Sequence, residues 1–208
     1  MKLEEIKAAF TKPLPGKNAQ YKMAPSYRPN LELEDVLKLN PKIGGVLVLL
    51  YEKKEELHII FTLRKTYSGV HSGQMSFPGG KKDDADTDVL KTALREAFEE
   101  VGVPVDRVEV IHKLSELYIP PSNFLVYPIV GFLSDKIDFI KQESEVEEIV
   151  EIPLRFFMQK GIGKETTIQL SEKVSVNVPA YVYNDYVIWG ATAIVMSELV
   201  EILKSEEI

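Results

Sequence analysis

The stretch from residue 77 to residue 103, FPGGKKDDADTDVLKTALREAFEEVGV, constrains the fold of this chain more than any other. Four of its apolar residues recur at the spacing of one helix face: Leu90, Leu94, Ala97 and Val101. This pattern predicts an amphipathic helix over Thr87–Val101. Gly102 follows, where a helix commonly ends in a left-handed residue. The apolar face of such a helix must pack against another element.

Strand-like runs lie on both sides of the predicted helix. They are Gly45–Tyr51, Leu57–Leu63, Val108–Glu116, Leu125–Leu133, Thr166–Leu170, Val174–Val178 and Tyr181–Tyr183. Lys53, Lys54 and Glu55 separate the first two runs at hairpin spacing. Further helices fit residues 2–11 and Gly190–Lys204, and an irregular arm rich in Pro and Gly fits residues 13–30. Strands, a central helix, more strands and a closing helix predict an α/β sandwich.

Composition excludes several classes of protein. The 208 residues include no cysteine, so disulfides, thiolate metal sites and cysteine nucleophiles are absent. The net charge of -7 argues against general nucleic-acid binding, although a local cation can still attract a small phosphate compound. The amino terminus has no signal-peptide pattern, and the longest apolar run, Val46–Tyr51, is too short to span a bilayer. We expect a soluble cytoplasmic protein with no membrane partner.

Three glutamates give the predicted helix a second, acidic face. Glu96, Glu99 and Glu100 are spaced at i, i+3 and i+4, which places them together and roughly opposite the apolar stripe. Like charges at this spacing destabilise a helix, and a divalent cation with oxygen ligands removes the repulsion. A solvated acidic surface is the commoner explanation of such a cluster. Here Arg95 lies four residues before Glu99 and can orient it, which favours a site.

The whole stretch resembles the signature of the Nudix hydrolases. That signature is a Gly, a five-residue gap, an acid, and then Arg-Glu-apolar-x-Glu-Glu-x-Gly-apolar. Gly80, Asp86 and the run Arg95–Val103 match it. Two departures are that Asp86 replaces a Glu and that the gap from it to Arg95 is eight residues, one more than usual. Both departures concern the start of the helix and the role of Asp86.

The resemblance implies a fold and a chemistry. The implied fold is an α/β/α sandwich around a mixed β-sheet. Glu96, Glu99 and Glu100 would bind Mg²⁺ or Mn²⁺, with the carbonyl oxygen of Gly80 as a further ligand. The ion would polarise a diphosphate and orient an attacking water, while a carboxylate accepts the proton. Arg95 would orient Glu99.

The resemblance also implies that a glutamate downstream of the sheet assists the metal or acts as the base. The acidic run over residues 143–151 contains two candidates, Glu145 and Glu148. We expect most of this run to be solvated loop.

Residues outside the signature resemble the coenzyme A diphosphatase branch of the family. They are Arg64, the run from His71 to Gly80 that includes Gln74, the arm residues Pro13–Gly16 and Arg28, and Ile188–Ala193. This resemblance implies hydrolysis of coenzyme A or its acyl derivatives to adenosine 3′,5′-bisphosphate and 4′-phosphopantetheine or its acyl form. Arg64, His71, Gln74 and Lys81 are the expected substrate-binding residues. The guanidinium fork of Arg64 suits phosphate oxygens.

We therefore expect one Nudix domain over residues 1–208, with an N-terminal helix and arm at 1–42, the Nudix signature at 79–103 and a C-terminal helix at 190–206. The expected partner is a small diphosphate compound, and a homodimer is left open. The alternative is a Nudix pyrophosphatase acting on ADP-ribose, NADH or a nucleoside triphosphate. A ligand sensor on the same scaffold would not need the acid cluster, and nothing in the sequence suggests a polypeptide-binding groove.

Overall fold

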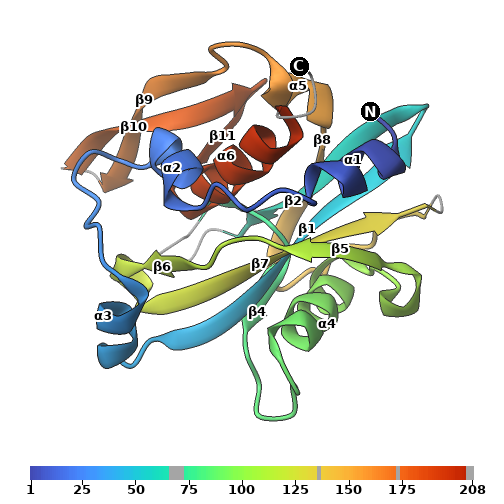
Figure 1. The fold of residues 1–208 in the computed structure, drawn as a ribbon, viewed down its shortest axis with the longest axis horizontal. Helices are drawn as coiled ribbons and strands as arrows, with labels where there is room; N and C mark the ends of the chain where they lie inside the picture. Colours follow the sequence, from blue (N-terminus) through green and yellow to red (C-terminus); the bar gives the residue numbers. More distant parts are fainter. Residues whose placement is uncertain (66–72, 135–136, 172–173, 205–208) are drawn as a thin grey trace.

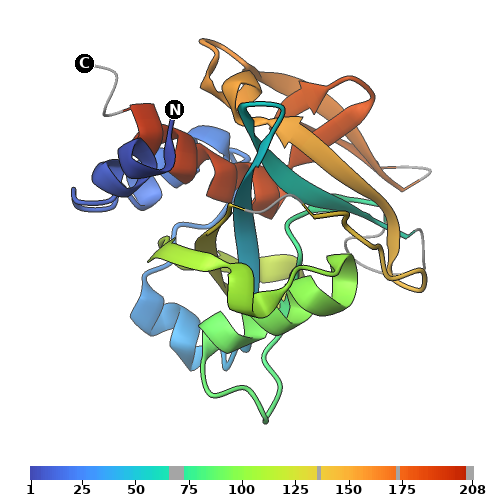
Figure 2. The same cartoon turned by 90° about the vertical axis from the view of Figure 1, so that its right-hand side faces the viewer.

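A central sheet lies between two layers of helices in the computed structural model, which describes residues 1–65, 73–134, 137–171 and 174–204. Figures 1 and 2 show α4 on one side of the sheet and α6 on the other. The predicted α/β/α sandwich around a mixed sheet is therefore confirmed. The helices are α1 (Leu3–Ala9), α2 (Lys17–Gln20), α3 (Leu33–Lys38), α4 (Val89–Val101), α5 (Leu154–Met158) and α6 (Gly190–Lys204). Short 3₁₀ helices are η1 (Tyr21–Met23), η2 (Val105–Arg107) and η3 (Pro120–Ser122).

Eight strands form the central sheet. They are β1 (Lys42–Lys53), β2 (Glu56–Arg64), β3 (Met75–Ser76), β4 (Gly79–Lys81), β5 (Glu109–Lys113), β6 (Leu117–Ile119), β7 (Phe124–Leu133) and β8 (Val146–Pro153). The sheet is mixed, because β1 and β7 run parallel while the other pairs are antiparallel. The β1–β2 hairpin turns through Lys54 and Glu55, both with positive φ, at the position predicted from the sequence.

Strand β1 lies at the centre of the core. Leu47 and Leu49 face the apolar cluster under α4, and Val48 and Leu50 face the larger cluster under α6. All four side chains are fully buried. Burial on both faces explains why this strand is a continuous apolar run instead of an alternating one.

A second, three-stranded sheet covers part of the α6 side. Its strands are β9 (Gly163–Ser171), β10 (Val174–Tyr183) and β11 (Tyr186–Trp189), paired in the order β11-β10-β9. Helix α6 follows β11 directly and packs into the larger core cluster. Within the described part of the chain, no helix combines the length and the apolar character needed to cross a bilayer.

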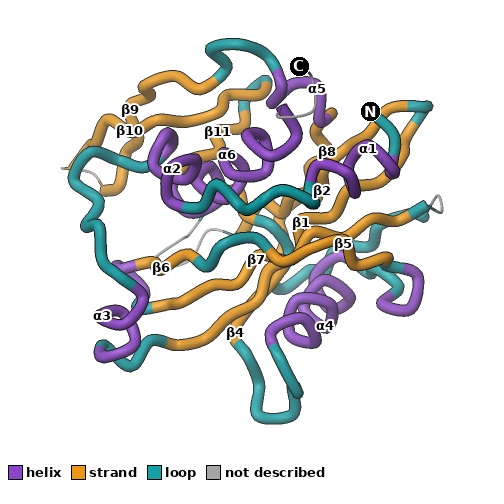
Figure 3. The backbone as a smooth tube through the Cα atoms, viewed as in Figure 1, coloured by secondary structure: helices purple, strands orange, loops and turns teal. Residues whose placement is uncertain are grey.

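The N-terminal arm contains more regular secondary structure than the sequence indicated. Figure 3 shows it leaving α1, passing over α6 through α2, and then descending beside the sheet to α3. Residues 13–30, expected to be irregular, include α2 and η1. The arm is built this way because α6 offers it buried hydrogen-bond partners, which local composition does not reveal.

Several predicted boundaries shift. Helix α4 begins two residues later than expected, because Asp88 is its N-cap and accepts a hydrogen bond of 2.8 Å from the amide of Lys91. The two predicted strands Val174–Val178 and Tyr181–Tyr183 are one strand, β10. The acidic run expected to be mostly solvated loop overlaps β8 from Val146 onward, because apolar residues alternate along that strand and it pairs with β2. Helix α6 is described up to Lys204, and residues 205–206 lie outside the described range.

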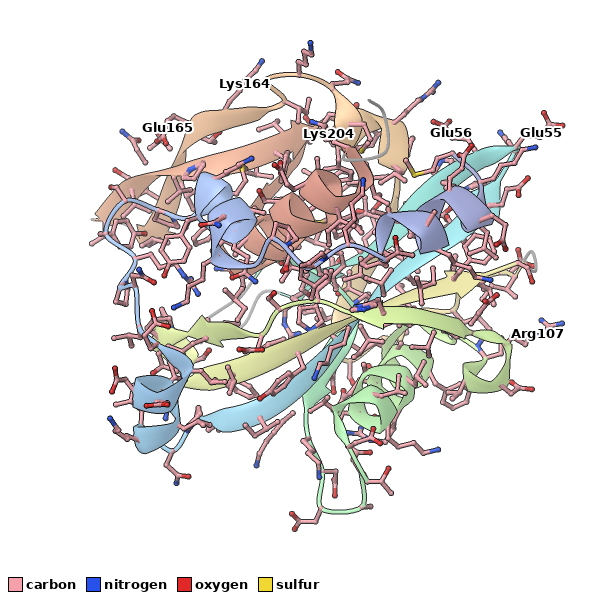
Figure 4. All side chains as sticks on the ribbon, in the orientation of Figure 1. Glu55, Glu56, Arg107, Lys164, Glu165 and Lys204 are labelled. Atoms are coloured by element: carbon pink, nitrogen blue, oxygen red, sulfur yellow. The ribbon has the colours of Figure 1, made fainter. Side chains whose placement is uncertain are left out.

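Charged side chains lie mostly on the rim of the molecule. Figure 4 shows exposed charged residues projecting outward: Glu55 from the β1–β2 turn, Arg107 from η2, and Lys164 and Glu165 from β9. The functionally interesting acids are those that depart from this pattern and lie between elements.

Candidate active site

The site is built on α4, which carries the three predicted metal-binding glutamates. Gly102 ends the helix with φ of 73°, the left-handed conformation predicted for it. The apolar stripe of the helix is buried against β1, as expected. This packing orients the remaining faces of α4 towards β4 and towards solvent.

Glu100 lies on the buried flank of α4, and 4% of its surface is exposed. Its Oε2 accepts a hydrogen bond of 3.0 Å from the amide of Gly79, and its Oε1 lies 3.8 Å from a guanidinium nitrogen of Arg64. The predicted position opposite the apolar stripe is wrong for Glu100, because it follows Ala97 by three residues and so lies about 60° around the helix from it.

Burial is the main reason that the pKa of Glu100 rises to about 7. The carboxylates of Glu96 and Glu145 act in the same direction, whereas the Gly79 amide and Arg64 act against it. The pKa of Glu96 is also raised, first by burial and then by the charges of Glu99 and Glu145, against the effect of Arg95. The site therefore concentrates negative charge in a place where water solvates it poorly.

Arg95 contacts two of the glutamates. Its Nη1 lies 2.9 Å from Oε1 of Glu96 and 3.2 Å from Oε2 of Glu99. The predicted contact with Glu99 is present in the structure. Glu99 itself is half exposed, so Arg95 holds it at the open side of the site.

Asp86 anchors Arg95 from the loop before α4. Its two carboxylate oxygens accept hydrogen bonds of 3.0 Å from Nε and 2.9 Å from Nη2 of Arg95. Thr92 and the Asp83 amide also donate to it, each at 3.0 Å. The Arg95 bonds are the main reason that the pKa of the buried Asp86 lies well below its ordinary value. The acid that replaces the Glu of the signature thus reaches Arg95 across the longer gap.

The structure separates the two downstream candidates. Glu145 precedes β8 and is close enough to Glu96 and Glu100 for its charge to raise the pKa of both. Glu148 lies within β8 and alternates with Val150 on the face towards α6, where its Oε1 accepts a hydrogen bond of 2.7 Å from Tyr186. Glu145 is therefore near the carboxylate cluster, and Glu148 is on the other face of the sheet.

The expected substrate residues have different surroundings. Arg64 is partly exposed beside Glu100, and among the described residues its buried Nε has no hydrogen-bond partner. The carbonyl oxygen of Gln74 accepts a hydrogen bond of 3.1 Å from the backbone amide of Arg64. Lys81 is exposed at the end of β4, and its carbonyl accepts a bond from Arg95. His71 lies outside the described residues.

Gly80 closes the site beside α4. It pairs with Gly45 of β1. A Cβ atom at Gly80 would stand 2.5 Å from Cδ of Glu96, so glycine is needed where β4 meets this carboxylate. The carbonyl oxygen of Gly80 lies against Gly44 on the β1 side. Its predicted role as a metal ligand stays a prediction.

The carboxylates fit a divalent cation in their chemistry. Within the described residues, no three acidic or histidine side chains already form a ready cluster of metal ligands. Glu96, Glu99 and Glu100 nevertheless supply hard oxygen donors, and the pKa of two of them is raised by burial and by like charge. A cation would relieve both effects. The fit depends on these side chains turning towards a common ion.

Comparison with known proteins defines the class of protein. The NUDIX domain matches residues 41–161, a range that contains β1, the glycines before α4, all three glutamates and β8. The chain therefore belongs to the Nudix hydrolase family, whose members hydrolyse diphosphate bonds and generally require a divalent metal ion.

Individual relatives are similar to this chain over most of its length. The mouse protein "Peroxisomal coenzyme A diphosphatase NUDT7" is 35% identical over 155 residues, which are 72% of this chain and 65% of that protein. "Nudix hydrolase 15, mitochondrial" of Arabidopsis thaliana is 35% identical over 77% of this chain, which spans 58% of that protein. A Yersinia enterocolitica relative named NudL is 36% identical over 71% of this chain and 75% of its own length.

A solved structure supports the fold alone. The MutT/nudix family protein from Enterococcus faecalis superposes with a TM-score of 0.54 and 19% identity, over 98% of this chain and 75% of that chain. The likeness extends through the C-terminal region that the NUDIX domain does not match.

Sequence reasoning missed two features of the site. One is the bond from the Gly79 amide to Glu100, although the paired glycines indicated a close backbone approach. The other is the group of buried polar residues on α6, Thr192, Ser197 and Glu198, whose partners lie more than 80 residues away in sequence. No local pattern points to these contacts.

Proposed function

We propose that this protein hydrolyses the diphosphate bond of coenzyme A or of its acyl derivatives, releasing adenosine 3′,5′-bisphosphate and 4′-phosphopantetheine or its acyl form. The proposal is carried by Arg64, whose guanidinium lies beside the carboxylate cluster and whose buried Nε has no hydrogen-bond partner in the part of the chain that the structure describes. Coenzyme A has three phosphoryl groups, so its binding needs a cation in addition to the metal. The mouse relative named as a coenzyme A diphosphatase supports the same substrate.

Each residue has a stated role in the proposal. Glu96, Glu99 and Glu100 would hold Mg²⁺ or Mn²⁺, which would act as a Lewis acid on the diphosphate and orient the water. Arg95, itself held by Asp86, keeps Glu96 and Glu99 at the open side of α4. Two hydrogen bonds that Arg95 donates to Asp86 restrict rotation of the guanidinium, so the carboxylates are oriented before metal and substrate bind.

Glu145 is the residue that we assign to proton transfer. Its carboxylate is exposed, precedes β8 and acts electrostatically on Glu96 and Glu100. It can accept the proton of an attacking water and release it to solvent. Glu148 is tied to Tyr186 on the other face, which makes it the weaker candidate.

The remaining parts of the proposal concern substrate contact and domain organisation. Arg64 and Gln74 lie side by side at the ends of β2 and β3, with Lys81 at the end of β4 as a second, exposed cation. We also propose that the chain acts as one domain, because the core cluster under α6 extends from Ile6 to Leu203.

A substrate panel tests the proposal. Coenzyme A, dephospho-coenzyme A, ADP-ribose and NADH are incubated with the protein and Mg²⁺ or Mn²⁺, and products are identified by mass. We expect coenzyme A to have the highest kcat/KM and dephospho-coenzyme A a lower one, since it lacks the 3′-phosphate. Preferred hydrolysis of ADP-ribose or NADH would overturn the assignment while leaving the family unchanged.

Arg64→Lys, with Lys81→Ala as its exposed comparison, refines the test. Lysine keeps the charge of Arg64 but loses the fork, so the KM for coenzyme A should rise about tenfold. Removing the solvated Lys81 should change it by less than threefold. Equal effects of the two variants would contradict the role given to Arg64.

A further inference from the structure

Helix α6 contacts the strip of chain that runs from the substrate-binding edge to the catalytic carboxylates. That strip, residues 74–80, contains β3 and the start of β4. At one end, the carbonyl oxygen of Gln74 accepts a hydrogen bond from the amide of Arg64. Further along, the amide of Gly79 donates a hydrogen bond to the carboxylate of Glu100. The placement of this strip therefore sets the relative positions of Arg64 and Glu100.

Among the described strands of the central sheet, β3 pairs with β2 alone. It pairs with β2, where Leu63 faces Met75 and Thr62 faces Ser76. Since the Gln74 carbonyl points at β2, the next carbonyl, that of Met75, points away from the sheet. A carbonyl directed into a buried region needs a donor.

Thr192 in the first turn of α6 supplies that donor. Its Oγ1 donates a hydrogen bond of 2.9 Å to the Met75 carbonyl, and both residues are buried. The bond joins residues 117 positions apart in sequence. It holds the outer edge of β3 against the C-terminal helix, while Thr62 holds Ser76 from the inner side.

We infer that Thr192 is a positioning residue that sets the substrate-binding edge formed by Arg64 and Gln74. The inference rests on the proposed function for the identity of the substrate. Thr192 does not touch the reacting atoms. It restricts β3, β3 restricts Gln74, and Gln74 restricts the backbone of Arg64.

Helix α6 offers a matched control. Ser197 is also buried, and its Oγ donates a hydrogen bond of 2.8 Å to the carbonyl of Ala19 in the N-terminal arm. Thr192→Val and Ser197→Ala each delete one buried hydroxyl that bonds a distant carbonyl. Both should lower the Tm by a similar few degrees. A role limited to stability would give the two variants the same kinetic behaviour.

The test combines hydrogen exchange with kinetics. In Thr192→Val, amide exchange should accelerate in residues 60–65 and 73–80, whereas Ser197→Ala should accelerate exchange in residues 15–20. The KM for coenzyme A should rise about three- to tenfold in Thr192→Val, with kcat within twofold, and should be unchanged in Ser197→Ala. Thr192→Ser keeps the hydroxyl and should restore the KM.

An unchanged KM in Thr192→Val, or the same exchange pattern in both variants, would overturn the inference. Failure of the proposed function would be recognised by a different result, because the wild-type protein would then leave coenzyme A intact. In that case ADP-ribose is the substrate for the same comparison. If the wild-type protein hydrolyses neither compound, selective exchange in residues 73–80 decides the outcome alone.

Discussion

The Glu100→Gln variant tests two effects of the buried Glu100 carboxylate: its contribution to turnover and its effect on the free energy of unfolding. Glutamine keeps the size of the side chain and an oxygen acceptor for the Gly79 amide. It removes the charge that we assign to metal binding. Turnover should therefore fall about a thousandfold, the usual effect of deleting a principal electrostatic stabiliser. The fold should survive, since the packing around residue 100 is retained.

The same substitution should stabilise the metal-free protein at neutral and alkaline pH. The pKa of Glu100 is raised from 4.5 to about 7, so ionising it in the folded state costs roughly 3 kcal/mol. A group with a raised folded-state pKa contributes stability that is present below about pH 4.5 and is lost as the pH rises through about 7. Glutamine does not titrate. The variant should thus exceed the wild type by up to about 3 kcal/mol at pH 8, and the gap should close near pH 4.5.

Urea unfolding from pH 4.5 to 8 in EDTA, followed by the same series with Mg²⁺, measures these effects. Mg²⁺ should raise the free energy of unfolding of the wild type and have little effect on Glu100→Gln. Glu147→Gln is the control. Glu147 is an exposed glutamate in β8, so replacing it should alter neither the free energy of unfolding nor the turnover. A Glu100→Gln protein with normal turnover, or one less stable than the wild type at pH 8 without metal, would refute this account of the site.

Two further substitutions test the surroundings of the glutamates. Asp86→Asn should lower the free energy of unfolding by about 3 kcal/mol at pH 7, because it breaks a paired carboxylate whose pKa is held low mainly by Arg95. That contribution is present above about pH 4 and is lost on acidification. The difference in the free energy of unfolding between Asp86→Asn and the wild type, measured by denaturant titration, should therefore shrink from about pH 4 to about pH 2. A difference that stays constant over this range would argue against the ion pair. Gly80→Ala places a Cβ 2.5 Å from Cδ of Glu96 and should reduce kcat about a hundredfold by displacing that carboxylate. Normal kinetics in Gly80→Ala would show that Glu96 is free to move.

Much of the site could be predicted because it lies on one helix. The apolar stripe, the glutamate spacing and Gly102 are local patterns, and helical periodicity converts them directly into faces. The central strand β1 could also be predicted from the sequence, because a strand that is buried on both faces appears as a continuous apolar run. Strand β8 was misread because its exposed glutamates resemble a solvated loop, and only pairing with β2 shows that Val146, Val150 and Ile152 are the informative residues.

The sequence by itself determined the class of this protein: an α/β chain whose central helix carries three glutamates in the Nudix pattern. Tertiary structure alone decided that the carboxylate of Glu100 contacts Gly79 and Arg64, that Glu145 and Glu148 lie on opposite faces, and that α6 holds the edge of β3. Periodicity reports which way a side chain points along its own element. Burial, charge coupling and hydrogen bonds between distant residues depend on what packs against that element, and that is set when the layers assemble.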